Sequence, residues 1–247
     1  MNELPLGASA LEILGETLAG LPSGAAWWGA RRTLIVADLH FEKGSSFARR
    51  GALLPPHDTR ATLERLGRDV AALDPVRVIS LGDAFHDAEG PERMDAADRA
   101  ALAALQISRE WAWIDGNHDA GVRADIGGVR MEEFQLGPLT FRHEPQPRER
   151  AAGEVAGHLH PAARVKVASG TVRRHCFVRD GRRLILPAFG AYAGGLDVAS
   201  RAFAGLFERA EVSVHLLGEG RVHAFPANHV SGFGVSRGGT GPHRASR

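Results

Sequence analysis

Histidine, aspartate and asparagine residues gather in five short strings between residues 38 and 160. The strings are Asp38-Leu39-His40, Gly82-Asp83, Gly116-Asn117-His118-Asp119, the single His143, and Gly157-His158-Leu159-His160. Imidazole nitrogens and carboxylate oxygens are the ligands that a divalent first-row metal takes where no thiolate is present. The single cysteine, Cys176, excludes a thiolate cluster and an internal disulfide. The strings therefore predict a metal site built from nitrogen and oxygen ligands.

The spacing inside the strings supports this interpretation. In the pairs Asp38/His40 and His158/His160 one residue separates the two side chains, so on extended backbone both point to the same face. Glycine precedes Asp83, Asn117 and His158, and a glycine lets backbone approach closely where a side chain would block the site. Each string alone is more often a turn or an exposed loop. Together, each beside a predicted strand, they favour a functional site.

The first half of the chain alternates strands and helices. Apolar runs predict strands over 33–37, 76–81 and 111–115, and each runs into one of the polar strings. Helical spacing predicts helices over 57–73, with Asp58 or Thr59 as N-cap, and over 94–108. Alternation of this kind favours a largely parallel sheet, whose ligands bind beyond the carboxyl ends of the strands.

The second half contains short strand-like runs without long helices between them. We expect strands over 139–142, 154–156, 164–167, 175–178, 183–186 and 212–216, forming a second, more antiparallel sheet. Two sheets packed face to face with helices outside would make an α/β sandwich. We expect a single domain over 1–225. Residues 226–247 are rich in Gly, Ser and Arg, which predicts a flexible tail.

The composition is that of an ordinary folded protein. Apolar residues make up 44% and charged residues 24%, and 30 basic residues against 29 acidic ones leave a net charge of +1. Bulk charge therefore gives no reason to expect non-specific nucleic-acid binding. The sequence lacks a run of about 20 apolar residues and a signal-peptide pattern, so we expect a cytoplasmic protein that does not contact a membrane.

The order DxH, GD, GNHD, H, GHxH resembles the calcineurin-like metallophosphoesterases over residues 33–160. The resemblance implies a four-layer αββα sandwich of two mixed sheets flanked by helices, with two metal ions bridged by one aspartate. Carried over to this sequence, the ligands of the first metal would be Asp38, His40, Asp83 and His160. Those of the second would be Asp83, Asn117, His143 and His158. By the same resemblance Asn117 and His118 would contact substrate, and His118 would protonate the leaving oxygen without binding metal.

Segments outside the five strings restrict the resemblance to one branch of the family. The string from Asp38 to Gly44, the Arg49-Arg50-Gly51 that follows, and the stretch from Leu186 to Gly195 resemble the DNA-ligase-associated (PdeM-type) branch over about residues 27–217. These bacterial proteins are DNA damage response endonucleases and phosphodiesterases that depend on Mn. The resemblance implies DNA as substrate and repair ligases, helicases or exonucleases as partners. Residues 82–87 lack the Gly-Asp-x-x-Asp-Arg-Gly string of Ser/Thr protein phosphatases, which argues against that activity.

The expected reaction is attack on a phosphodiester by a metal-bridging hydroxide, with Asp83 and His118 as catalytic residues. A hydrolase of small phosphodiesters or nucleotides with the same site is one alternative, and a non-catalytic binding module of a repair complex is another. The ligand types suit Mn, Fe and Zn alike. Two further features stay open: Asp87 either orients an imidazole or is an ordinary loop acid, and Arg49, Arg50 and Arg142 either hold nucleic acid or are solvated.

Overall fold

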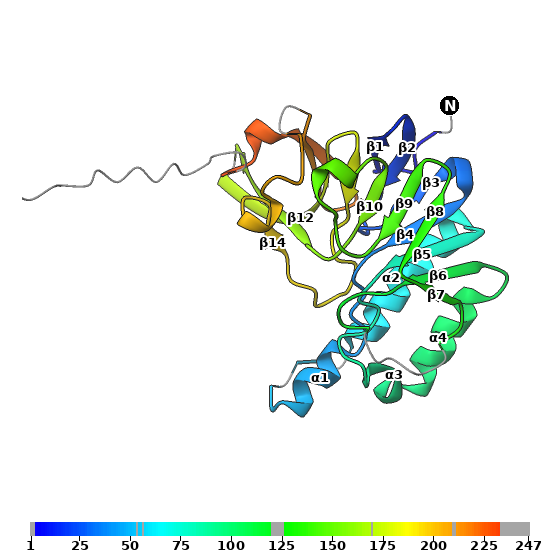
Figure 1. Cartoon of the computed structure of the whole chain (residues 1–247). Coiled ribbons are helices and arrows are strands. Elements are labelled where there is room, and N and C mark those ends of the chain that lie inside the picture. The colour runs from blue at the N-terminus through cyan, green and yellow to red at the C-terminus, as the bar shows by residue number, and fades with distance from the viewer. Residues whose placement is uncertain are drawn as a thin grey trace, which may run out of the picture.

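The computed structural model describes residues 3–232, except 53, 56, 120–125, 169 and 209–210. Two β-sheets pack face to face, and the longer helices lie beside the first of them (Figure 1). None of the helices in the described ranges has both the length and the apolar character needed to cross a membrane.

The first sheet has the strand order β1-β2-β3-β4-β5-β6-β7. Its strands are β1 (Ser9–Ile13), β2 (Glu16–Gly20), β3 (Ala26–Trp28), β4 (Thr33–Val36), β5 (Arg77–Leu81), β6 (Glu110–Ile114) and β7 (Val129–Met131). β1 to β4 pair antiparallel, whereas β4 to β7 pair parallel. Because β4, β5 and β6 are parallel, the polar strings that follow them leave the sheet at one edge.

Four α-helices connect or flank these strands. They are α1 (Lys43–Arg49), α2 (Asp58–Leu73), α3 (Gly90–Arg93) and α4 (Ala96–Gln106). The two long helices were predicted, but the N-cap of α2 is His57. The side chains of Asp58 and Thr59 are used elsewhere, because they accept hydrogen bonds from the backbone N–H groups of Gly44 (3.1 Å) and Glu42 (2.9 Å). These bonds fasten α2 to α1.

The second sheet is also mixed. Its strands are β8 (Glu133–Leu136), β9 (Leu139–Arg142), β10 (Glu154–Ala156), β11 (Pro161–Val167), β12 (Gly170–Arg179), β13 (Arg183–Ile185), β14 (Leu196–Asp197), β15 (Ser213–Leu217) and β16 (Val222–Pro226). The order is β14-β11-β12-β13-β10-β9-β8, with β15 paired to β12 and β16 to β15. β10 runs parallel to β9 and β13, and β11 antiparallel to β12. Short 3-10 helices complete the chain: η1 (Gly29–Arg31), η2 (Arg148–Arg150), η3 (Arg201–Phe203) and η4 (Ala227–His229).

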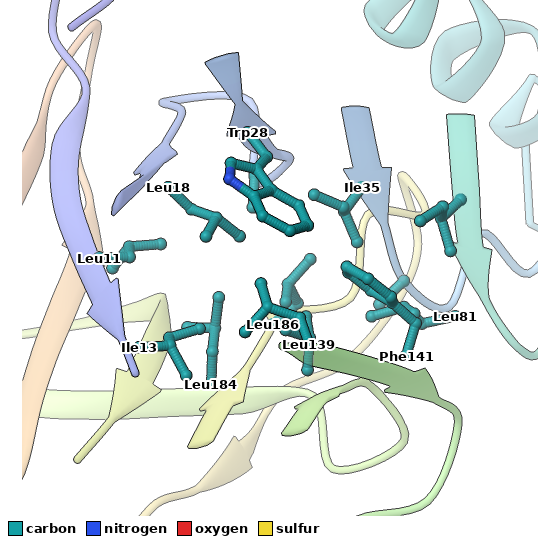
Figure 2. Packing of buried hydrophobic residues seen from close by; sticks show 14 of the residues in the cluster. Leu11, Ile13, Leu18, Trp28, Ile35, Leu81, Leu139, Phe141, Leu184 and Leu186 are labelled. Atoms are coloured by element: carbon teal, nitrogen blue, oxygen red, sulfur yellow. The ribbon is translucent and has the colours of Figure 1, made fainter. Parts of the chain in front are cut away.

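Apolar side chains from both sheets form the central core. In Figure 2, Trp28 and Ile35 of the first sheet face Leu186 and Phe141 of the second. Complete burial of a large apolar side chain stabilises the fold by roughly 1.5–3 kcal/mol. Trp28 is fully buried, and its indole N–H donates to Glu16 Oε2 at 3.1 Å, so burial leaves no unpaired donor. This core holds the two sheets in one relative position.

Different structures cover the two outer faces. The outer face of the first sheet packs against Leu66 of α2 and Leu102 of α4, and Trp111 and Trp113 lie in this layer as core residues. The outer face of the second sheet packs against Phe203 of η3 and its neighbours. The expected α/β sandwich of two mixed sheets is confirmed, with short 3-10 helices and loops over the second sheet among the described residues.

The chain stays ordered beyond the expected start of the tail at 226. β16 ends at Pro226, η4 follows, and Val230 is buried and bridges to Val165. Val230 packs into the apolar cluster on the outer face of the second sheet, because its side chain is apolar although the segment around it is mostly polar. Residues 233–247 of the predicted tail lie outside the described residues.

Candidate metal centre

The predicted ligands come from loops of both sheets. Asp38 follows β4, Asp83 follows β5, and Asn117 follows β6. From the second sheet, His143 follows β9, and His158 and His160 lie between β10 and β11. The structure brings the carboxylates and imidazoles together where the edges of the two sheets meet.

One group comprises Asp38, His40 and His160, whose ligand atoms all lie within 4.8 Å of one another. The His160 Nε2 atom is 3.4 Å from Asp38 Oδ1 and 3.3 Å from His40 Nε2. Imidazole nitrogens and a carboxylate oxygen therefore converge on one point.

A second group comprises Asp38, Asp83 and His143, and His158 packs against His143. His143 Nδ1 lies 2.9 Å from the Leu81 carbonyl oxygen, which can only accept, so Nδ1 is the donor in this hydrogen bond. The lone pair of the neutral ring is then on Nε2, which lies 3.0 Å from His158 Nδ1. The Leu81 carbonyl thus fixes the orientation of the His143 ring.

Asp83 contacts an imidazole of each group. Its Oδ2 is 3.9 Å from His40 Nε2, and its Oδ1 is 3.6 Å from His143 Nε2. Asp38 is a member of both groups, but the atom of His143 that it approaches, at 3.8 Å, is Nδ1, which is already bonded to Leu81. Of the two carboxylates, Asp83 is therefore the one whose oxygens approach an Nε2 atom in each group.

The backbone of the site is unusual. Five of its non-glycine residues have a positive φ between 44° and 67°: Asp38, His40, Asp83, His158 and His160. This left-handed conformation is uncommon for residues with a Cβ and costs free energy. The pairs Asp38/His40 and His158/His160 therefore do not lie on the extended backbone that the sequence argument assumed.

Three glycines admit close packing around the ligands, as predicted from their positions. A Cβ on Gly82 would collide with the ring of His143, and one on Gly116 would collide with Asp83. A Cβ on Gly157 would lie 2.8 Å from Asp38 Oδ2. Each glycine thus leaves room for a ligand donated by another string.

Burial and neighbouring charges shift the pKa values of the histidines. Burial, helped by His160, lowers the pKa of His40 to about 2. Burial and His143 lower the pKa of His158. Burial also disfavours protonation of His160, but hydrogen bonding to Asp38 and the charges of Asp38 and Asp83 outweigh it and raise its pKa. Neutral His40 and His158 are in the state that binds a metal.

The donor set fits divalent cations. The carboxyl group of Asp38 is fully buried and Asp83 is 4% exposed, yet among the described residues neither pairs with an arginine or lysine. Buried carboxylates need a compensating positive charge. Facing imidazole nitrogens 3.0–3.3 Å apart can present lone pairs to the same ion.

His118 lies beside the two groups. Its backbone N–H donates to Asp83 Oδ1 at 2.9 Å, and its ring Nδ1 donates to the His86 carbonyl at 2.7 Å. The ring stacks on His86 at 5.3 Å between centroids and meets His40 edge-on. Asn117 is exposed and lines a pocket together with His143, next to the backbone that contacts Asp83.

Sequence reasoning gave no role to Asp119, although it closes the GNHD string. The structure buries this carboxylate, which accepts hydrogen bonds from the backbone N–H groups of Gly116 and Ala84, both at 3.0 Å. It thereby ties the loop after β6 to the loop carrying Asp83. Asp87 is the loop acid of the two alternatives, because both of its oxygens lie 2.9 Å from Arg93.

Comparison with known proteins agrees with this geometry. Residues 31–182 match the family model described as calcineurin-like phosphoesterase. The chain belongs to this family. As a calcineurin-like phosphoesterase it is a metal-dependent phosphoesterase, which confirms the resemblance noted in the sequence.

One similar solved structure is the crystal structure of Pseudomonas putida nuclease MPE. The two chains are 30% identical, the TM-score is 0.67, and the match covers 88% of this chain and 100% of that one. This neighbour is consistent with the DNA-related branch of the calcineurin-like phosphoesterases. A comparison with curated proteins finds no match.

Proposed function

We propose that this chain is a binuclear metal-dependent phosphodiesterase that cleaves DNA. The observation that carries the proposal is the position of Asp83, with one oxygen toward His40 and the other toward His143. An aspartate so placed can be shared by two ions a few ångströms apart. The nuclease neighbour supports a nucleic-acid substrate.

The residues divide into two ligand sets. Asp38, His40, Asp83 and His160 would hold one ion, and Asp83, Asn117, His143 and His158 the other. Bound divalent ions would neutralise phosphoryl charge and lower the pKa of a coordinated water. Mn is the ion we propose, and the same donors suit Fe and Zn.

His118 would supply a proton to the leaving oxygen. In the protonated ring, Nδ1–H donates to the His86 carbonyl, and Nε2–H is left to donate to substrate. As water oxygen bonds to phosphorus and the P–O bond to the leaving group breaks, that proton passes to the departing oxygen. The contacts of the ring with the His86 carbonyl and the His86 ring support this role, because they fix the ring while its backbone N–H bonds to Asp83.

The biological setting that we propose is bacterial DNA repair in the cytoplasm, alongside repair ligases, helicases or exonucleases. The nuclease neighbour supports the link to nucleic acid. The one cysteine, Cys176, is buried and unpaired, which suits a reducing compartment.

The test uses protein from which a chelator has removed the metal and which is then reloaded with Mn²⁺. Hydrolysis of an aryl phosphodiester, the matching monoester and a DNA oligonucleotide is then measured. We expect diester cleavage to exceed monoester cleavage and to vanish with chelator. Asp83→Asn should lose activity, whereas Asp74→Asn, at an exposed ion pair with Arg32, should keep it.

Other results would favour the alternatives. Cleavage of the aryl diester and of small nucleotides without cleavage of DNA would indicate a small-molecule hydrolase. No turnover with any divalent ion would indicate a binding module.

A further inference from the structure

Charge is distributed unequally on the two sides of the metal centre, although the chain as a whole is nearly neutral. In the second sheet the predicted ligands follow β9 and β10 and precede β11, strands that lie between β8 at one end of the strand order and β14 at the other. β8 continues the sheet on one side, and the β11–β12 hairpin continues it on the other (Figure 1). These two sides carry opposite charges.

The β11–β12 hairpin presents cations on one face. Its register places Arg164 opposite Arg173 and Lys166 opposite Thr171. Alternate residues of a strand share a face, as do residues directly opposite across an antiparallel pair, so the three cations lie on the same side. All three are exposed, whereas Val165 on the other face is buried in the outer core. We name Arg164, Lys166 and Arg173 the basic track.

The basic track is only partly neutralised by its neighbours. Arg164 pairs with Asp197, but Arg173 donates to the neutral carbonyl of Gly195. Lys166 has no ion-pair partner within the described part of the chain. Cations facing each other across strands repel, so this face favours an anion that would lie over it.

The basic track begins at the metal centre. His160, a predicted ligand, directly precedes β11, and its backbone carbonyl accepts from the N–H of Leu196 at 2.8 Å. His175 lies opposite Ala162 on the same face as the track and packs close to Gly195. A polynucleotide leaving the site past His160 would first cross the segment at Gly195, which covers Ala162 and His175 on this face, and would then reach Arg173 and Lys166.

The opposite side of the centre is acidic. A pocket next to His143 and Asn117 is lined by carboxylates: Asp115, Glu132, Glu133 and Glu144. Asp115 pairs with Arg130 and Glu133 with Arg142. Glu132 and Glu144 leave a net negative charge, which repels a phosphate chain.

We propose that a single-stranded polynucleotide crosses this centre with its phosphates on one side only, along the basic track. The proposal rests on the proposed function, because it takes the bond to be cleaved as a phosphodiester. Arg164 and Lys166, two residues apart on one strand, are separated by about 6.6 Å, comparable to the distance between successive phosphates of an extended strand. A narrow strip of three cations on one face of a two-stranded hairpin suits one polynucleotide strand, which phosphate contacts position without reading sequence.

The first test measures binding without turnover. Anisotropy of a labelled dT oligonucleotide is followed in chelator for the wild type, for Lys166→Glu/Arg173→Glu, and for Arg31→Glu/Arg182→Glu. The control pair changes charge equally, but its residues precede β4 and β13, away from the edge that carries the site. We expect the track variant to bind at least about tenfold more weakly and to lower the salt slope by about 1.4. Equal weakening by both variants, or none by the track variant, would overturn the proposal.

The second test asks whether binding is one-sided. Two series of dT oligomers carry a p-nitrophenyl phosphodiester at the 5′ end or at the 3′ end. We expect kcat/KM to rise with oligomer length in one series only, and the rise to disappear in Lys166→Glu/Arg173→Glu while single-nucleotide esters are cleaved as before. A rise in both series would contradict the one-sided path. Track-dependent binding without any hydrolysis would refute the proposed function and leave the binding track standing.

Discussion

The contacts that the ring of His118 makes within the described residues are with the His86 carbonyl and with the rings of His86 and His40. We therefore predict that His118→Ala slows diester hydrolysis by about 10²–10⁴-fold, the usual contribution of a positioned proton donor. Metal content, measured by elemental analysis after dialysis, should match the wild type. Normal turnover, or loss of metal, would contradict the role given to this residue.

Gly82 tests the packing around His143 separately from backbone strain. Gly82 and Gly205 have nearly the same φ, 76° and 77°, but a Cβ on Gly82 would meet the His143 ring while one on Gly205 would meet nothing within 4 Å. Alanine at either position should cost about 1–2 kcal/mol of unfolding free energy from the left-handed backbone. Only Gly82→Ala should also lose bound metal and activity. Similar metal content in the two variants would show that His143 can move aside.

At the scale of single elements, β15 carries a buried histidine that links pH to stability. His215 Nδ1 and Nε2 lie 2.8 Å and 2.9 Å from the hydroxyls of Ser9 and Ser213, and burial lowers its pKa to about 4. In the unfolded chain His215 takes up a proton near pH 6.5, whereas in the folded chain it does so only near pH 4. Stability is therefore greatest above pH 6.5 and falls as the pH drops through this window, by up to about 3 kcal/mol for this group.

The prediction is checked with His215→Gln, which keeps an amide donor and acceptor but does not titrate in this range. Urea unfolding in chelator at pH 7 and pH 5 should give a smaller loss of stability for the variant than for the wild type. Because the other histidines are present in both chains, the difference isolates His215. Parallel losses would contradict the prediction.

The elements that the sequence predicted are those with regular apolar spacing. Leu63, Leu66 and Val70 indicate α2, and the apolar runs ending at Val36, Leu81 and Ile114 indicate β4, β5 and β6. The strands β1 to β3 were missed, although Leu11, Ile13 and Leu18 are buried and a turn at Leu14-Gly15 separates the first two strands. The alternation of apolar and polar residues in these strands covers only a few positions. The apolar residues are buried by a second sheet whose strands lie far along the chain.

The residue types of the candidate site could be predicted from the sequence, but the backbone contacts that hold those residues in place could not. Gly82, Gly116 and Gly157 could be interpreted because each precedes a ligand string. The roles of the Leu81 and His86 carbonyls could not be predicted, because every residue has a backbone carbonyl whatever its side chain. The basic track likewise depends on the pairing of β11 with β12, which brings Arg164 and Arg173 together.

At the scale of the whole molecule, the proposed metal ligands come from both sheets. Asp38 and Asp83 belong to the first sheet, and His143 and His160 to the second. We predict that metal raises the free energy of unfolding by about 2.7 kcal/mol at a free concentration one hundred times Kd. Urea unfolding of the wild type with Mn²⁺ and with chelator measures the difference. Asp83→Asn should gain much less, and an equal gain in both chains would place the stabilising ion elsewhere.

The left-handed backbone at Asp38, His40, Asp83, His158 and His160 sets stability against chemistry within the same five residues. Glycine would relieve the strain at each position, but it would also remove the carboxylate or imidazole there. A substitution that stabilises the fold at one of these positions is therefore expected to remove a proposed metal ligand. The strained conformations are concentrated where the proposed ligands lie, as is usual for functional sites.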